Sequence, residues 1–188
     1  MGPPGIGIDR GADGAAVLVM LVGRPASGKS YVARLLAERL GYELIQTDAL
    51  RRMLFPRPRY TPAESRAVYA EAHHRIERAL RTGRSAIFDA TNLKERPRRL
   101  VYRIADEAGA RLVIALASAP VWLVRQRLAA RAAGRDPLDA SEATWAVFLR
   151  LGRPQPISRP HLLVNTAVDL RQAVELVAAR SLDTVTGS

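Results

Sequence analysis

The sequence predicts an α/β protein built on a doubly wound sheet of five parallel strands, with helices on both faces. Five apolar runs alternate with segments of helical periodicity along the chain. The runs are almost continuously apolar, which is typical of parallel strands that helices cover on both faces of the sheet. The 188 residues, 48% of them hydrophobic, are enough for one compact domain with a sizeable core.

The expected elements follow in order from these patterns. We expect strands at 16–22, 42–47, 85–90, 111–117 and 161–166, and helices at about 30–40, 62–82, 95–108, 120–133, 141–150 and 169–181. The helix at 62–82 begins with a capping box, in which Thr61 caps the helix, Pro62 takes the first turn and Glu64 bonds back to the cap. Glycines suited to a left-handed conformation follow three helix ends, at Gly41, Gly83 and Gly109.

The composition is strongly basic and rich in arginine. A net charge of +11 attracts polyanions, because basic side chains neutralise phosphates and release counterions. Lys29 and Lys94 are the only lysines, so a general arginine bias of composition explains the same charge equally well. Charge alone therefore leaves nucleic acid binding and compositional bias as equal interpretations.

The absence of cysteine excludes disulfides and thiolate zinc sites, and fits a reducing compartment. The longest apolar run, 15–22, is too short to span a bilayer, and the first residues lack the pattern of a secretory signal. We therefore expect a cytoplasmic monomer or homodimer with no membrane partner. The expected layout is a flexible leader at 1–15, one domain at 16–182 with a helical lid at about 125–140, and a tail at 183–188.

The segment "GRPASGKS" at 23–30 has the spacing of a phosphate cradle, between an apolar strand and an amphipathic helix. Its glycines let backbone N–H groups point at phosphate oxygens, and the following helix adds its positive end. Lys29 is expected to reach the β- and γ-phosphates, and the Ser30 hydroxyl to bind Mg²⁺. The predicted ATP-binding residues here are Gly23, Arg24, Pro25, Ala26, Ser27, Gly28, Lys29, Ser30 and Tyr31.

The second apolar run ends in "QTDALRR", which places Asp48 at the carboxyl end of a strand that we expect beside the cradle. A carboxylate there can accept the proton of an acceptor hydroxyl that attacks the γ-phosphorus. Arg51 lies three residues on, on the same helical face, where it can bind an anionic group of the acceptor. The alternative interpretation is a helix-capping aspartate with a solvated arginine.

The third run ends in "FDATNLKERPRR", which places Asp89 at another strand end, followed by Thr91 and Asn92. Asp89 can hold a Mg²⁺-bound water, or orient Arg51 or the acceptor. A simple turn at the end of the strand is the alternative. Because parallel strands end at one edge of the sheet, we expect these side chains to share one crevice with Lys29 and Asp48.

Four arginines follow the fourth strand, in "APVWLVRQRLAARAAGRDP". Arg127, Arg131 and Arg135 recur every four residues and so share one helical face, with Arg125 nearby. We predict that this face closes over the nucleotide and neutralises charge on the transferring phosphoryl group. A solvated basic helix face is the alternative.

Together, "GRPASGKS", "TDALR", "DATNLKERPRR" and "RLAARAAGRDP" resemble the kinase domain of the polynucleotide 5′-hydroxyl kinases. This domain belongs to a wider family of small P-loop kinases that includes zeta toxins and seryl-tRNA kinases. The resemblance spans 17 to about 140 and implies a P-loop kinase-like fold that uses ATP, or another NTP, and Mg²⁺. The Asp-x-Asp-x-Thr phosphatase motif is not present, so no 3′-phosphatase activity is expected.

The resemblance also implies roles for individual residues. Asp48 would be the general base, and Arg51 would bind the phosphate next to the attacked hydroxyl. Asp89 and Thr91 would shape the acceptor site, and Arg131 would stabilise the β- and γ-phosphates. Asn92 belongs to the same predicted acceptor site, and Lys29, Asp48 and Arg131 are the predicted catalytic residues.

Three functions remain open on the sequence. The first is a kinase acting on the 5′-hydroxyl of a nucleic acid, which the charge and Arg51 favour. The second is a kinase for a small-molecule alcohol, such as a metabolite or an antibiotic, on the same scaffold. The third is a nucleotide-dependent switch without an acceptor, which Asp48 disfavours because such a switch needs a positioned water rather than a base beside an acceptor.

Overall fold

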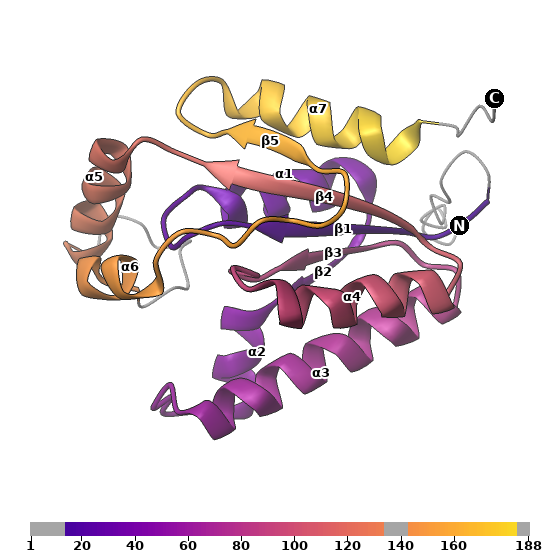
Figure 1. Cartoon of the computed structure of the whole chain (residues 1–188), viewed down its shortest axis with the longest axis horizontal. Helices are drawn as coiled ribbons and strands as arrows, with labels where there is room; N and C mark the ends of the chain where they lie inside the picture. Colours follow the sequence, from indigo (N-terminus) through magenta and orange to yellow (C-terminus); the bar gives the residue numbers. More distant parts are fainter. Residues whose placement is uncertain (1–13, 134–142, 184–188) are drawn as a thin grey trace, which may run out of the picture.

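Five parallel strands form one sheet, in the order β2-β3-β1-β4-β5, in the computed structural model, which describes residues 14–133 and 143–183 (Figure 1). The strands are β1 (Val17–Val22), β2 (Glu43–Gln46), β3 (Ala86–Asp89), β4 (Arg111–Ser118) and β5 (Leu162–Asn165). Every pairing between neighbouring strands is parallel. The predicted five-stranded, doubly wound sheet is therefore confirmed.

Helices cover both faces of this sheet (Figure 1). They are α1 (Lys29–Leu40), α2 (Thr47–Leu54), α3 (Pro62–Arg81), α4 (Glu95–Glu107), α5 (Val121–Ala132), α6 (Trp145–Leu151) and α7 (Leu170–Leu182). Helices α1 and α7 pack on one face and α3 and α4 on the other, while α5 and α6 lie beyond the carboxyl ends of the strands (Figure 1). The short helix α2 was not among the expected helix ranges, although Asp48 and Arg51 were expected to share one helical face.

Strand β1 is the centre of the core and is buried along its whole length. Its side chains alternate between the two faces: Leu18, Met20 and Val22 pack with α3 and α4, and the intervening residues pack with α1 and α7. Burying a large apolar side chain contributes about 1.5–3 kcal/mol, so this strand stabilises both layers at once. The cradle that follows β1 therefore starts from the most firmly held strand.

The strand order corrects one prediction. The sequence analysis placed Asp48 at the end of the strand beside the cradle, but β3 and not β2 lies next to β1. After β1 the chain forms β2 at the edge of the sheet. The long helix α3 then leads the chain back to β3, which lies between β2 and β1. Asp89 consequently aligns with Leu21 on one side and Gln46 on the other, and Asp48 lies one strand further away.

The helix ends agree largely with the sequence signals. Gly41, Gly83 and Gly109 have φ angles of 67°, 73° and 60°, as expected for left-handed residues after a helix. The Thr61 hydroxyl accepts a hydrogen bond from the Glu64 N–H at 3.2 Å, which confirms the cap. The Glu64 carboxylate differs from the prediction, because it accepts the backbone N–H of Arg59 rather than that of the cap.

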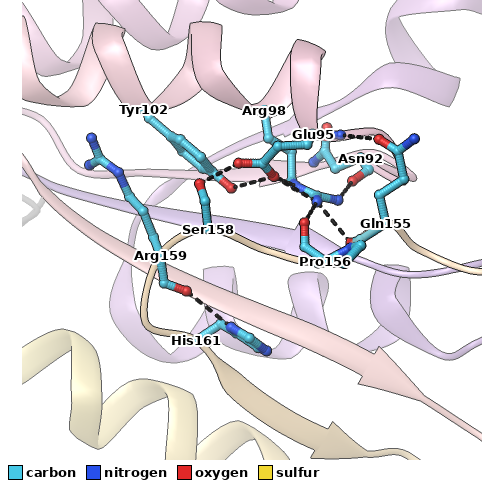
Figure 2. A network of polar contacts seen from close by, with 9 residues as sticks. All are labelled: Asn92, Glu95, Arg98, Tyr102, Gln155, Pro156, Ser158, Arg159 and His161. Atoms are coloured by element: carbon cyan, nitrogen blue, oxygen red, sulfur yellow. Dashed lines mark hydrogen bonds and ion pairs between the residues drawn. The ribbon is translucent and has the colours of Figure 1, made fainter.

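A buried guanidinium joins α4 to the segment between α6 and β5 (Figure 2). The Arg98 side chain is fully buried and donates to the carbonyls of Asn92 (2.8 Å), Gln155 (2.9 Å) and Pro156 (2.6 Å). It also pairs with the Glu95 carboxylate at 2.7 Å. Because one planar fork satisfies three carbonyls and a carboxylate, it fixes the backbone that leaves β3.

Glu95 extends this network (Figure 2). Its carboxylate accepts hydrogen bonds from Ser158 and, at 3.4 Å, from the Tyr102 hydroxyl. Partial burial opposes ionisation of Glu95, but the hydrogen bonds from Ser158 and Arg98 outweigh it and hold the pKa of Glu95 below 4.5.

Some expected features fall outside the described residues. The predicted leader, the tail and the distal half of the predicted lid fall largely or wholly within 1–13, 134–142 and 184–188. Across 14–133 and 143–183, none of the helices combines the length and apolar character that a membrane crossing requires.

We predict that Arg98→Leu lowers the free energy of unfolding by about 3–5 kcal/mol, because it removes one partner of a buried ion pair and leaves three carbonyls without a donor. A lowered pKa means that Glu95 stabilises the fold above pH 4.5 and loses this effect as the pH falls through its folded value. The decrease in the free energy of unfolding at acid pH should therefore be smaller in Arg98→Leu than in the wild type. Urea unfolding of both proteins from pH 7 to pH 3 measures the two effects.

The control for this prediction is Arg103→Leu on the same helix. The Arg103 side chain is 65% exposed and lies 3.8 Å from Glu107, so its loss should change stability by no more than about 0.5 kcal/mol. Equal losses in the two variants would contradict a special role for Arg98.

Candidate active site

The loop between β1 and α1 has the curled backbone that its spacing predicts. Gly28 has a φ of 87° and caps α1, Ala26 has a φ of 58°, and the Ser27 N–H donates to the Arg24 carbonyl at 3.1 Å. The positive end of α1 lies at Lys29, directly after this loop. The loop thus has the backbone form of a phosphate cradle.

Thr166, at the end of β5, holds this loop in place. Its hydroxyl donates to the Ser27 carbonyl at 2.6 Å and accepts from the Arg127 guanidinium at 3.1 Å. Arg127 also donates to the carbonyls of Ala26 (3.2 Å) and Thr166 (2.8 Å), and burial lowers the pKa of Arg127. The guanidinium predicted to contact phosphate is therefore engaged in fixing the cradle.

Two cavities meet at the cradle. The larger cleft, of about 630 Å³, extends toward α2, α3 and α6, and the smaller cavity, of about 220 Å³, lies between the cradle, α5 and the start of α7. Lys29, Ser30 and Arg34 line both cavities. A group bound at Lys29 and Ser30 would therefore face both spaces.

Asp89 lies beside the cradle lysine. Its carboxylate is 3.9 Å from the Lys29 ammonium and accepts a hydrogen bond from the Gln46 amide at 2.9 Å. The second carboxylate oxygen, Oδ1, is buried and has no hydrogen-bond partner in the described structure. This placement shows that Lys29 and Asp89 meet, as the sequence predicted.

The donor set at the cradle fits a magnesium ion. Mg²⁺ prefers hard oxygen ligands and is usually bound through one or two carboxylates together with substrate phosphates. The Asp89 Oδ1 atom and the Ser30 hydroxyl supply such oxygens at the larger cleft. Among residues 14–133 and 143–183 there is no cluster of three or more acidic, histidine or cysteine ligands, so an all-protein metal cage is not formed there.

Asp48 and Arg51 both lie in the larger cleft. Within the described part of the chain, the Asp48 carboxylate forms no hydrogen bond or ion pair. The Arg51 guanidinium is buried, 3.4 Å from the Ser65 hydroxyl and 3.7 Å from the Glu64 carboxylate, and its Nε and Nη1 atoms have no hydrogen-bond partner in the described structure. The cleft thus offers a carboxylate that is not engaged and a buried cation with unsatisfied donors.

Two tyrosines complete the larger cleft, and the sequence analysis did not predict either of them. Tyr69 of α3 lies close to Asp48, Arg51 and Asp89, and burial raises its pKa despite a hydrogen bond with Thr91. The Arg51 guanidinium lies over the Tyr60 ring, with its central carbon 4.8 Å from the ring centre. Thr91 lines the cleft as predicted, and its carbonyl accepts the Gly23 N–H at 3.0 Å.

Two predicted ligand residues have other contacts. The Asn92 amide donates to the Leu21 carbonyl at 2.7 Å, and Asn92 does not line the larger cleft, so it positions the end of β3 rather than an acceptor. The Arg24 guanidinium donates to the Phe148 carbonyl at 2.6 Å and lies 3.4 Å from the centre of the Phe148 ring. Arg24 therefore attaches α6 to the cradle.

The predicted lid is only partly described. Arg131 lines the smaller cavity together with Tyr31, whereas Arg135 lies outside the described residues. Helix α6 borders the larger cleft through Val147, Arg150 and Leu151.

Some of the missed residues carry a sequence signal. Thr166 lies at the carboxyl end of a predicted strand, as Asp48 and Asp89 do, so the same strand-end argument identifies it. Arg34 lies four residues after Ser30, on the same face of α1. Tyr60 and Tyr69 carry no such signal, because only the packing of α2 and α3 brings them to the cleft.

The chain matches known proteins along most of its length. Residues 18–154 match a family model described as "AAA domain". An uncharacterized protein of Mycobacterium tuberculosis (strain ATCC 25618 / H37Rv) is 30% identical over 162 residues, which cover 76% of this chain and 32% of the relative. The chain therefore spans about a third of the length of the curated relatives it matches.

Solved structures share the fold. Chaetomium thermophilum Kti12, in complex with ADP-AlF3, has a TM-score of 0.69 and 22% identity, over 89% of this chain and 100% of that chain. The Mycobacterium tuberculosis APS kinase CysC, in complex with AMPPNP and APS, has a TM-score of 0.63 and 20% identity, over 87% and 96% of the two chains. The chain thus has the α/β fold of P-loop kinases.

We predict that Gly28→Ala weakens nucleotide binding by about tenfold or more, the order of one lost charge-assisted hydrogen bond. An added Cβ would lie 2.8 Å from the Thr166 hydroxyl and so displace the contact that holds the cradle. The matched control is Gly109→Ala, where φ is also positive (+60°) but no atom lies within 4 Å of the added carbon.

Both variants should lose about 1–2 kcal/mol of stability from the left-handed backbone, but only Gly28→Ala should lose affinity for an ATP analogue in calorimetric titration. Unchanged affinity in Gly28→Ala would show that the nucleotide does not bind at this loop.

Proposed function

The chain belongs to the AAA domain family, and from that premise we propose that it is a Mg²⁺-dependent P-loop kinase that transfers the γ-phosphate of ATP to the 5′-hydroxyl of a nucleic acid. The observation that carries this proposal is the meeting of two cavities at Lys29 and Ser30. A phosphate held there has space for the rest of a nucleotide on one side and for an alcohol acceptor on the other. A protein that only hydrolysed or sensed the nucleotide would not need the larger cleft.

The cradle binds and orients the phosphates. Backbone N–H groups of the loop and the positive end of α1 face the phosphate oxygens, and the Lys29 ammonium neutralises the β- and γ-oxygens. Ser30 and Asp89 would hold Mg²⁺, which when bound supplies positive charge to the oxygens that become more negative during transfer. The contact between Asp89 and Lys29 orients the ammonium before the nucleotide arrives.

The larger cleft binds and activates the acceptor. Asp48 takes the proton of the acceptor hydroxyl as its oxygen forms a bond to the γ-phosphorus. The bond between the γ-phosphorus and the bridging oxygen breaks, and the electron pair leaves with ADP. Asp48 suits this role because no ion pair or hydrogen bond in the described structure engages its carboxylate.

Arg51 supports an acceptor with an anionic group near the attacked hydroxyl. Among the residues that the structure describes, its buried Nε and Nη1 donors have no hydrogen-bond partner, and a phosphate oxygen is the acceptor that a guanidinium fork fits best. In a polynucleotide the first phosphate lies about one nucleotide from the 5′-hydroxyl, and Arg51 lies about one helical turn from Asp48 on α2.

The exposed side of helix α4 also favours a polyanion. Helix α4 begins shortly after Thr91, and its exposed side carries Arg96, Arg99 and Arg103 around a shallow groove of about 490 Å³. Together with the net charge of +11 of the whole chain, these arginines suit a chain of phosphates.

A small-molecule alcohol is the second candidate acceptor. The larger cleft, of about 630 Å³, has the size of a small-ligand pocket, and the fold is shared with an APS kinase solved with APS. Arg51 would then bind a carboxylate or phosphate on the small molecule.

The deciding experiment supplies γ-labelled ATP and Mg²⁺ with a panel of acceptors: oligonucleotides with a 5′-hydroxyl, nucleoside 3′-phosphates, plain nucleosides, sugars and no acceptor. We expect transfer to the first two classes, with acceptor affinity that falls steeply with salt for oligonucleotides. Transfer to sugars alone would favour the small-molecule kinase, and release of phosphate without any acceptor would exclude a kinase.

We predict that Asp48→Asn lowers kcat by about 10²–10⁴-fold, because the amide keeps the shape of the side chain but cannot take the proton. Affinity for an ATP analogue should stay unchanged in calorimetric titration. Asp106→Asn serves as the control and should leave kcat unchanged. Asp106 lies on α4 and forms an exposed ion pair with Arg159. Parallel losses of ATP affinity and rate in Asp48→Asn would instead assign Asp48 to the metal or to the fold.

We predict that Arg51→Ala lowers kcat/KM for a nucleoside 3′-phosphate by the equivalent of about 1.5–3 kcal/mol, the value of one charged hydrogen-bonded contact. The same variant should change kcat/KM for the plain nucleoside little, and Arg51→Lys should recover only part of the loss. Steady-state kinetics with both acceptors measures the difference. If the wild type uses both acceptors equally well, Arg51 does not recognise a phosphate.

A further inference from the structure

Tyr60 has a backbone conformation that a tyrosine rarely adopts. Its φ is +55°, in the left-handed region that favours glycine and asparagine. Bulky residues remain in this region only where their surroundings hold them, and such strain gathers at functional sites. The residue lies in the connection between α2 and α3, at the edge of the larger cleft.

Glu64 holds the chain on both sides of Tyr60. Its carboxylate oxygens each accept the Arg59 N–H at 3.0 Å, and its own N–H donates to the Thr61 hydroxyl at 3.2 Å. The same carboxylate lies 3.7 Å from the Arg51 guanidinium. One side chain therefore fixes the strained residue and the buried cation relative to each other.

The Tyr60 ring contacts the acceptor site without joining the core. The Arg51 guanidinium carbon lies 4.8 Å from the ring centre, and Tyr60 lines the larger cleft. Even so, 48% of the residue is exposed. A strained backbone thus presents an aromatic surface to the cleft, next to the cation that suits a phosphate.

We propose that Tyr60 forms a nucleobase-stacking subsite, so that the acceptor is a nucleotide unit recognised by its base as well as by its phosphate. This inference rests on the proposed function. The hydroxyl of the unit faces Asp48, its anionic group meets Arg51, and its planar base stacks on the exposed part of the Tyr60 ring. Stacking tolerates every base, since each has an aromatic face, so the subsite selects for a base without selecting a sequence.

The test compares two acceptors that differ only in the base. One is adenosine 3′-phosphate, and the other is its abasic tetrahydrofuran analogue with the same 5′-hydroxyl and 3′-phosphate. We expect the wild type to use the adenosine compound with a KM lower by about tenfold or more.

Two substitutions separate stacking from backbone strain. Tyr60→Gly removes the ring and suits a positive φ, so it should be at least as stable to urea as the wild type. It should nevertheless raise KM for adenosine 3′-phosphate to the value of the abasic analogue, whose own KM stays unchanged. Tyr60→Phe keeps the ring and should behave like the wild type with both acceptors.

Three results would overturn the inference. Equal use of both acceptors by the wild type would show that no base is recognised, while the kinase assignment would stand. A similar loss with both acceptors in Tyr60→Gly would show that the ring acts only by positioning Arg51. Failure of the wild type to phosphorylate any member of the acceptor panel would reject the proposed function, and the subsite with it.

Discussion

The whole site depends on the parallel register that sets Asp89 between Leu21 of β1 and Gln46 of β2. Because these strands end level with one another, the cradle after β1 and helix α2 after β2 begin at the same edge of the sheet. A shift of one residue in β3 would turn the Asp89 side chain to the other face of the sheet. The Lys29 ammonium, which is also buried, would then lose the carboxylate 3.9 Å away.

Residues that do not line the larger cleft hold the ends of these strands in register. The Asn92 amide binds the Leu21 carbonyl at 2.7 Å, and the Asn92 carbonyl in turn accepts the Arg98 guanidinium at 2.8 Å. The end of β1, the turn after β3 and the start of α4 are thereby joined. Thr91 precedes this anchored residue, so its place in the cleft depends on contacts that face away from the cleft. Thr166 does the same for the cradle through the Ser27 carbonyl.

The sequence was sufficient for the strands, for the helices other than α2, and for residues that follow directly from a strand end or a loop spacing. Apolar runs located every strand, and the cradle spacing located Lys29 beside Asp89. The order of the strands could not be predicted, because the sequence does not show whether the strand after α3 lies at the edge of the sheet or between β2 and β1. The roles of Arg24 and Arg127 could not be predicted either, since their partners are Phe148 and Thr166, far away in the chain.

The burial of Arg51 sets how the proposed kinase would choose among alcohols. A neutral acceptor that filled the cleft would cover the Nε and Nη1 donors of Arg51 without satisfying them, at a cost of about 1–3 kcal/mol. An acceptor with a phosphate in that place avoids the cost and gains charge-assisted hydrogen bonds. Glu64 cannot supply these bonds, because at 3.7 Å it is too far from Nη1 for a hydrogen bond and its oxygens already accept the Arg59 N–H. The cleft therefore discriminates among acceptors mainly because a neutral acceptor leaves the buried Arg51 donors unsatisfied, and less because a phosphate adds hydrogen bonds.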